Sequence, residues 1–138
     1  MAAAYPVPPA EVTADEHLLR RCSRDCLTGN RVKPRAFYAS KLPFQISVDR
    51  SDYCDAIGEA HAAGRGGAEL QAGPVRELPS EPQIEPDPPP TPHANIRAKA
   101  TLEKQPEPAT KAEAEATDLW AAHAAMCEQL AGIAKPLL

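Results

Sequence analysis

The sequence has few large apolar side chains. Leu, Ile, Val and Phe together make up 23 of the 138 residues, and the hydrophobic fraction of 43% is inflated by 26 alanines. This composition lies near the range of intrinsically disordered proteins, because little apolar surface is left to bury. We therefore expect one small domain, and a large hydrophobic core is excluded.

Long apolar runs are also missing. No run approaches the roughly 20 residues that a bilayer-spanning helix needs, and residues 1–9 lack the basic and apolar regions of a secretory signal. We therefore expect a cytoplasmic protein that has no membrane partner. In that compartment the four cysteines would be reduced thiols and would not form a disulfide framework.

A strong charge of one sign is absent as well. The net charge is −4, which divides into +3 over residues 1–50 and −7 over residues 51–138. Domains that bind nucleic acid are usually strongly basic. The charge balance therefore gives no compositional evidence for a nucleic-acid partner.

Capping and periodicity predict a small domain over residues 13–100. A capping box over residues 13–16 predicts a first helix. Alternating apolar and polar residues predict a strand over 44–49, and Ser51 is placed to cap a second helix over 52–63. Short extended segments are also expected at 31–39, 68–72, 75–78 and 93–97.

Proline-rich and polar segments surround this domain. Residues 1–12 are expected to form a disordered arm. Residues 79–92 contain seven prolines and should be extended but unable to join a central strand. Residues 101–109 resemble a polar linker. The predicted fold class is α+β: a small mixed domain of two helices and several short strands, with a disordered N-terminal arm and a C-terminal amphipathic helix.

The segment of residues 110–135 has the clearest helical pattern. A capping box over residues 110–113 precedes apolar residues that recur at intervals of four and three. Because the rest of the chain is poor in apolar residues, we expect this helix to bind a larger protein or to self-associate. The alternative is that it folds back over its own domain. The residues expected to contact a partner are Leu119, Trp120, Met126, Leu130 and Ile133.

Four segments in the middle of the chain form a pattern. They are Arg31-Val-Lys-Pro-Arg-Ala-Phe37, Ile46-Ser-Val-Asp-Arg50, Gly67-Ala-Glu-Leu70 and Asp87-Pro-Pro-Pro-Thr-Pro-His93-Ala-Asn-Ile96. The set resembles a family of small uncharacterised bacterial proteins that share A-F, then S-V-D/Y-R, and close with D-P-x-P-x-x-P-x-H-A-x-I. The resemblance covers roughly residues 17–97 and departs at Cys22-Ser23, where a His-Pro pair is expected. It implies a domain boundary but no mechanism, because the family has no established activity.

Cysteine and histidine offer a metal-site alternative. Cys22 and Cys26 are four apart on the expected first helix and could bind zinc with Cys54 and His61. The competing interpretation is that the cysteines are small apolar core residues. No C-x-x-C pair is present, and we expect neither a metal nor a cofactor.

A basic surface around residues 20–41 suggests an alternative function, the binding of nucleic acid or a nucleotide. Its cations would hold phosphates, while Phe37, Tyr38 and Phe44 would stack on bases. The competing interpretation is a solvated face with no ligand. The residues expected to form this surface are Arg20, Arg24, Arg31, Lys33 and Arg35.

His93 could make this alternative function catalytic. Asp87 or Asp49 could orient the imidazole as a general acid or base, and Arg50 could hold an anionic substrate. The chain contains no G-x-S-x-G, Walker A, H-E-x-x-H or dinucleotide-binding motif. The favoured hypothesis is therefore a non-catalytic adaptor that acts through its C-terminal helix.

Overall fold

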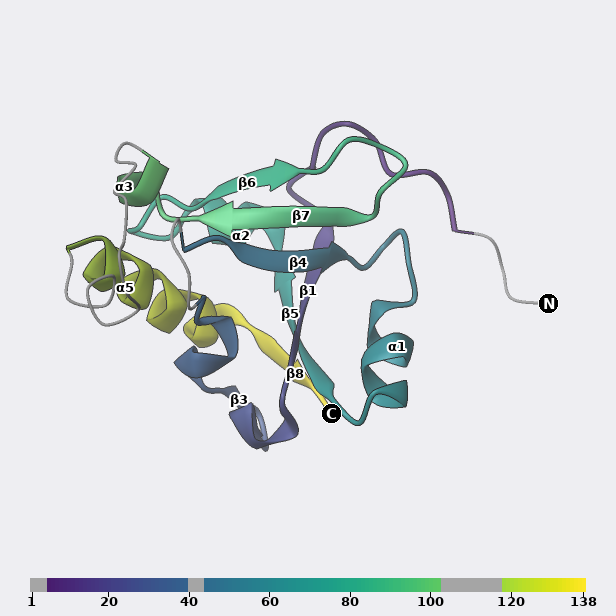
Figure 1. Cartoon of the computed structure of the whole chain (residues 1–138), viewed down its shortest axis with the longest axis horizontal. Coiled ribbons are helices and arrows are strands. Elements are labelled where there is room, and N and C mark those ends of the chain that lie inside the picture. The colour runs from purple at the N-terminus through teal and green to yellow at the C-terminus, as the bar shows by residue number, and fades with distance from the viewer. Residues whose placement is uncertain (1–4, 40–43, 103–117) are drawn as a thin grey trace, which may run out of the picture.

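A computed structural model describes residues 5–39, 44–102 and 118–138. Its centre is a six-stranded sheet in which every paired neighbour is antiparallel. Figure 1 shows the strands between helices that lie on opposite faces. The strands, in spatial order, are β6 (Gln83–Pro86), β7 (His93–Arg97), β4 (Ile46–Arg50), β1 (His17–Cys22), β5 (Gly66–Gln71) and β8 (Lys135–Leu137).

Two helices flank the sheet, and several short elements complete the domain. α5 (Asp118–Ile133) packs on one face, and α1 (Ala56–Ala62) packs on the other face, over β1 and β5 (Figure 1). The α+β class expected from the sequence is confirmed. The short elements are η1 (Arg24–Cys26), β2 (Leu27–Thr28), β3 (Arg31–Val32), η2 (Pro34–Phe37), α2 (Ala72–Arg76) and α3 (Lys99–Leu102).

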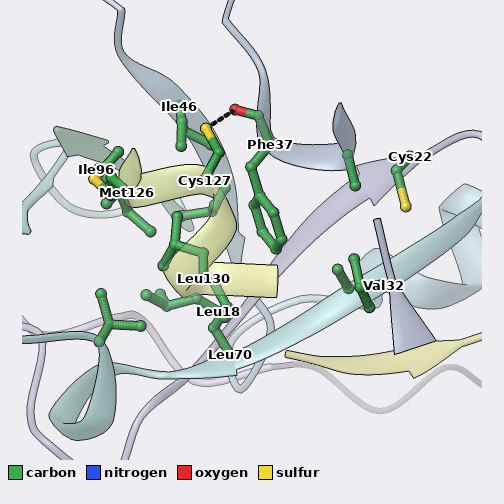
Figure 2. Packing of buried hydrophobic residues seen from close by; sticks show 14 of the residues in the cluster. Leu18, Cys22, Val32, Phe37, Ile46, Leu70, Ile96, Met126, Cys127 and Leu130 are labelled. Carbon is green, nitrogen blue, oxygen red and sulfur yellow. Dashed lines mark hydrogen bonds between the residues drawn. The ribbon is translucent and has the colours of Figure 1, made fainter. Parts of the chain in front are cut away.

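The hydrophobic core lies between the sheet and α5. Met126, Cys127 and Leu130 of α5 are buried against Leu18 of β1 and Leu70 of β5. Figure 2 shows these side chains converging, with the Cys127 thiol donating to the carbonyl oxygen of Phe37 at 3.5 Å. The few large apolar residues of the chain are thus concentrated on one sheet face and one helix.

The helix expected from residue 13 is wrong, because β1 occupies His17–Cys22. Residues 13–16 form a single turn, in which the Glu16 amide donates to the Thr13 carbonyl at 3.1 Å. β1 is paired on both sides and covered on both faces, so the consecutive residues Leu18 and Leu19 are both buried. A strand that is buried on both faces loses its alternation and can mimic helical spacing.

Other segments match the sequence pattern to different degrees. The extended piece expected at 75–78 is wrong in part, because α2 continues to Arg76. The second helix begins later than expected, at Ala56, where the Asp55 carboxylate accepts from the Gly58 amide at 3.3 Å. The proline-rich segment 79–92 contributes β6 at the edge of the sheet, where prolines are tolerated. The capping box at 110–113 lies outside the described residues.

A buried ion pair attaches the N-terminal arm to the sheet. Arg50 is fully buried, and its guanidinium donates to both carboxylate oxygens of Glu16 at 2.7 and 2.8 Å. The same guanidinium donates to the carbonyls of Pro9 (2.7 Å) and Glu11 (3.1 Å). The arm, for which we expected disorder, is described from Tyr5 onward and packs against the domain here. Residues 1–4 lie outside the described part.

Within residues 5–39, 44–102 and 118–138, no helix is long and apolar enough to cross a bilayer.

Candidate functional site

A polar pocket lies on the sheet face opposite α5. α1 packs over β1 and β5 on this face, whereas Ser47 of β4 stays exposed and His93 of β7 stays half-buried. The space encloses about 320 Å³, and we call it the sheet-face pocket. Its lining consists of Arg20, Arg21, Ser47, Val48, Asp49, Arg65 and His93.

The sheet-face pocket contains a histidine oriented by a carboxylate. Nδ1 of His93 lies 2.7 Å from Oδ2 of Asp87. The other oxygen of Asp87 accepts from the Asn95 side-chain amide at 3.3 Å, which fixes the carboxylate. The interaction at Nδ1 leaves Nε2 as the ring nitrogen that can exchange a proton with a ligand. An imidazole held in this way is suited to general acid–base chemistry.

The proline-rich connection between β6 and β7 brings these two residues together. The Asp87 amide donates to the His93 carbonyl at 2.9 Å, which closes the connection directly at the strand ends. The Arg50 amide donates to the Pro92 carbonyl at 2.9 Å and ties the same connection to β4. Proline restricts the backbone, so this loop presents Asp87 with little conformational freedom.

Arg21 forms a fixed network on the floor of the pocket. Its Nε donates to Asp49 at 2.8 Å, and its Nη2 donates to Glu59 of α1 at 2.6 Å. These hydrogen bonds raise the pKa of Arg21, chiefly through Asp49. The register of β4 and β7 places Asp49 directly opposite His93, and both line the pocket. The network therefore holds a carboxylate beside the imidazole.

Arg65 completes the pocket, whereas the guanidinium of Arg20 lies on the α5 face of the sheet, near Cys127 and His123. Arg20 donates through Nε to the Ala36 carbonyl (3.1 Å) and through Nη1 to the Ser47 carbonyl (2.9 Å), and burial lowers its pKa. Arg65 lies in the turn before β5, is exposed, and has no ion-pair partner among the described residues. Two guanidinium groups, of Arg21 and Arg65, thus outnumber the one lining carboxylate, Asp49, in a chain of net charge −4.

The residues considered for catalysis fall into two groups. His93, Asp87 and Asp49 meet at the sheet-face pocket. The proposed substrate-binding role of Arg50 is wrong, because its side chain is buried on the opposite face with Glu16. Arg65 was missed by sequence reasoning, since a single arginine after a glycine turn carries no distinctive signal.

The residues of the expected basic surface do not form one surface. The Arg20 guanidinium donates to the Ala36 carbonyl of η2 on the α5 face, whereas Arg31 and Lys33 line a separate groove beside the C-terminal end of α5. Arg35 pairs with Asp25 at 3.2 Å. Arg24 is exposed on η1, so it is not a neighbour of Arg20 on a helix as we expected.

The possible zinc ligands are also dispersed. Cys22 and Cys26 are buried in the core beneath α5. Cys54 is half-buried and contacts the Arg50 carbonyl, and His61 is exposed on α1. Among residues 5–39, 44–102 and 118–138, no group of three or more possible ligands could hold a metal ion.

The residues expected to bind a partner lie mostly inside the domain. Leu119, Met126 and Leu130 are buried, and Trp120 packs edge-on against the ring of Phe44 at a centroid distance of 5.4 Å. Only Ile133 of this set is exposed, with 40% of its surface accessible. The apolar stripe of α5 thus completes the chain's own core, which is the alternative interpretation of the tail helix.

A second pocket lies at the other side of α1 and has the opposite charge. It encloses about 220 Å³ and includes His17, whose Nδ1 lies 3.0 Å from Asp52. Asp55 and Glu69 also line this pocket, and no lysine or arginine does. Of the two pockets, the sheet-face pocket is therefore the one suited to an anion.

Comparisons with known proteins do not assign the chain to a group. No family model, no curated protein and no solved structure matches it.

Proposed function

We propose that this protein binds a phosphate-bearing ligand of the nucleotide class in the sheet-face pocket. The observation that supports the proposal is the meeting of two arginines, Arg21 and Arg65, with the His93–Asp87 pair around one pocket. The positive lining in a net acidic chain concentrates anions at this point of the surface.

The two arginines contribute in different ways. Arg21 is fixed by two carboxylates, so its guanidinium keeps a defined position. Arg65 forms no ion pair with a described residue, so its planar fork of donors can face the ligand. Guanidinium groups bind phosphate oxygens through paired hydrogen bonds, which explains the choice of phosphate over a neutral ligand.

The adaptor hypothesis has less support. It rested on an apolar stripe that would need a partner, and that stripe is buried against the chain's own sheet. Docking through Leu119, Met126 and Leu130 would require α5 to leave the domain, which would expose the core. We also propose a cytoplasmic location, because nucleotides are abundant there and the four cysteines are free thiols.

Calorimetric titration of the full-length protein with AMP and with inorganic pyrophosphate at low salt tests the proposal. We expect binding that weakens as salt is added, because the interaction is mainly ionic. Arg65→Ala should weaken binding about tenfold or more, since removal of a charge-assisted hydrogen bond costs about 1.5–3 kcal/mol.

Arg24→Ala is the matched control, because it removes an exposed arginine outside the pocket. This variant should bind like the unchanged protein. Failure of the unchanged protein to bind either probe, or equal losses in the two variants, would refute the proposed site.

A further inference from the structure

We infer that the ligand of the sheet-face pocket is an RNA phosphodiester, and that the pocket cleaves it by transesterification. This inference rests on the proposed function, because the substrate must first bind through its phosphate. It is carried by the presence of an imidazole, a carboxylate and guanidinium groups on one side of the sheet.

RNA contains its own nucleophile next to each phosphate, the ribose 2′-hydroxyl. Its cleavage therefore needs a base for the hydroxyl proton, an acid for the leaving oxygen, and positive charge for the phosphate. The pocket contains each of these groups. Because the nucleophile is intramolecular, the protein needs to position only one substrate molecule.

Two adjacent strands position the base and the acid. Asp49 of β4 and His93 of β7 are register partners, and side chains directly opposite in an antiparallel pair have Cβ atoms about 4.5–5.5 Å apart. A phosphate placed over this pair reaches both side chains. Asp49 is held by Arg21, and His93 is held by Asp87, so neither group needs to reorganise on binding.

The proposed step is balanced in atoms and electrons. Asp49 accepts the proton of the 2′-hydroxyl, and the 2′-oxygen forms a bond to phosphorus. The bond from phosphorus to the 5′-oxygen of the next nucleotide breaks, and protonated His93 donates its Nε2 proton to that oxygen. The products are a 2′,3′-cyclic phosphate and a free 5′-hydroxyl, and the step consumes no oxidant, reductant or water.

Arg65 then has a defined role. Negative charge increases on the phosphate oxygens as the fifth bond to phosphorus forms, and guanidinium groups stabilise that charge. Arg21 is committed to Asp49 and Glu59, so it holds the base in position. Asp87 is a positioning residue that directs Nε2 of His93 toward the leaving group.

The surroundings of the pocket suit a polymer. Ser47 and Glu85 are exposed, and Asn95 is half-buried, on the strands that continue the pocket across β4, β7 and β6. Nucleotides on either side of the scissile phosphate can therefore extend along the sheet, whereas an enclosed cavity would accept only a mononucleotide.

The test uses a fluorescent DNA oligonucleotide that contains one internal ribonucleotide, with an all-DNA oligonucleotide as the substrate control. The full-length protein should cut only the first, at the ribonucleotide, and leave a 2′,3′-cyclic phosphate that mass spectrometry identifies. His93→Gln should slow cleavage about a hundredfold or more. Arg24→Ala, prepared in the same way, should cut at the unchanged rate.

Asp87→Asn provides a second measurement that a purely structural role would not affect. The amide no longer fixes the imidazole tautomer, so kcat should fall and its pH profile should change while KM stays similar. Circular dichroism checks that each variant is folded.

The outcomes separate the two proposals. If the protein binds AMP or pyrophosphate and the oligonucleotide but does not cut it, this inference is wrong and the proposed function stands. If His93→Gln cuts as fast as the unchanged protein, the cleavage comes from a contaminating nuclease and the inference is also wrong. If neither the probes nor the oligonucleotide bind, both proposals fail.

Discussion

His123 on α5 makes the domain sensitive to acid. Its side chain is fully buried, its Nε2 accepts from the Ala39 amide at 3.0 Å, and its ring stacks on Phe44 at a centroid distance of 5.2 Å. Burial, with a further contribution from Arg20, lowers the pKa of His123 from 6.5 to about 4. The folded state therefore holds this ring in its neutral form.

The sign of the effect follows from this lowered pKa. Well above pH 6.5 the ring is neutral in both the folded and the unfolded state, so it does not change the folding stability. As the pH falls toward about 4, the imidazole of His123 is protonated in the unfolded chain but stays neutral in the folded chain, so folding stability is lost. The lowered pKa of His123 therefore reduces the free energy of unfolding by about 2 kcal/mol at about pH 5. The reduction reaches about 3 kcal/mol below the pKa of the folded state.

Urea denaturation of the unchanged protein and of His123→Gln, measured at about pH 7 and about pH 5, isolates this contribution. Glutamine can still accept from the Ala39 amide, but it does not titrate. Carboxylates titrate equally in both proteins, so only the unchanged protein should lose the additional 2 kcal/mol or so at the lower pH. Parallel stability profiles for the two proteins would refute the burial of a neutral His123.

Two other buried groups lead to further predictions. Glu16→Gln leaves the Arg50 charge without its partner, so it should lower the free energy of unfolding, measured in urea, by about 3–5 kcal/mol. The exposed control Glu11→Gln should lower it by less than about 0.5 kcal/mol. Similar small losses in both variants would show that the pair is dispensable. Burial raises the pKa of Cys127 to about 12, so this thiol should resist alkylation at neutral pH until the protein unfolds. Rapid modification of Cys127 in the native protein would contradict its place in the core.

Local patterns were sufficient where an element buries one face. Ile46 and Val48 alternate with polar residues, and the strand they predict is confirmed as β4. The extended segment expected at 93–97 matches β7 in both bounds. α5 lies within the range expected for the C-terminal helix, because its apolar residues recur at helical spacing. In each of these elements the buried side chains have the same spacing as the apolar residues in the sequence.

The sequence could not show how distant segments come together. Asp87 and His93 flank one short connection, so their pairing was among the possibilities considered. Arg65 joins them only because the strand order places β4 and β1 between β7 and β5, and that order depends on pairing over long distances in the chain. Strand alternation already places Arg50 on the opposite face from Asp49, but no local pattern shows that Glu16 and the N-terminal arm cover Arg50 there.

The position of α5 late in the chain order has a consequence for synthesis. The sheet strands before it can emerge from the ribosome first, but the apolar face formed by Leu18, Leu70 and their neighbours has no cover until α5 follows. A nascent chain that stalls before this helix would therefore expose the apolar face of an incomplete sheet to chaperones and proteases. Completion of this core is thus coupled to translation of α5, which makes interrupted synthesis a route to degradation.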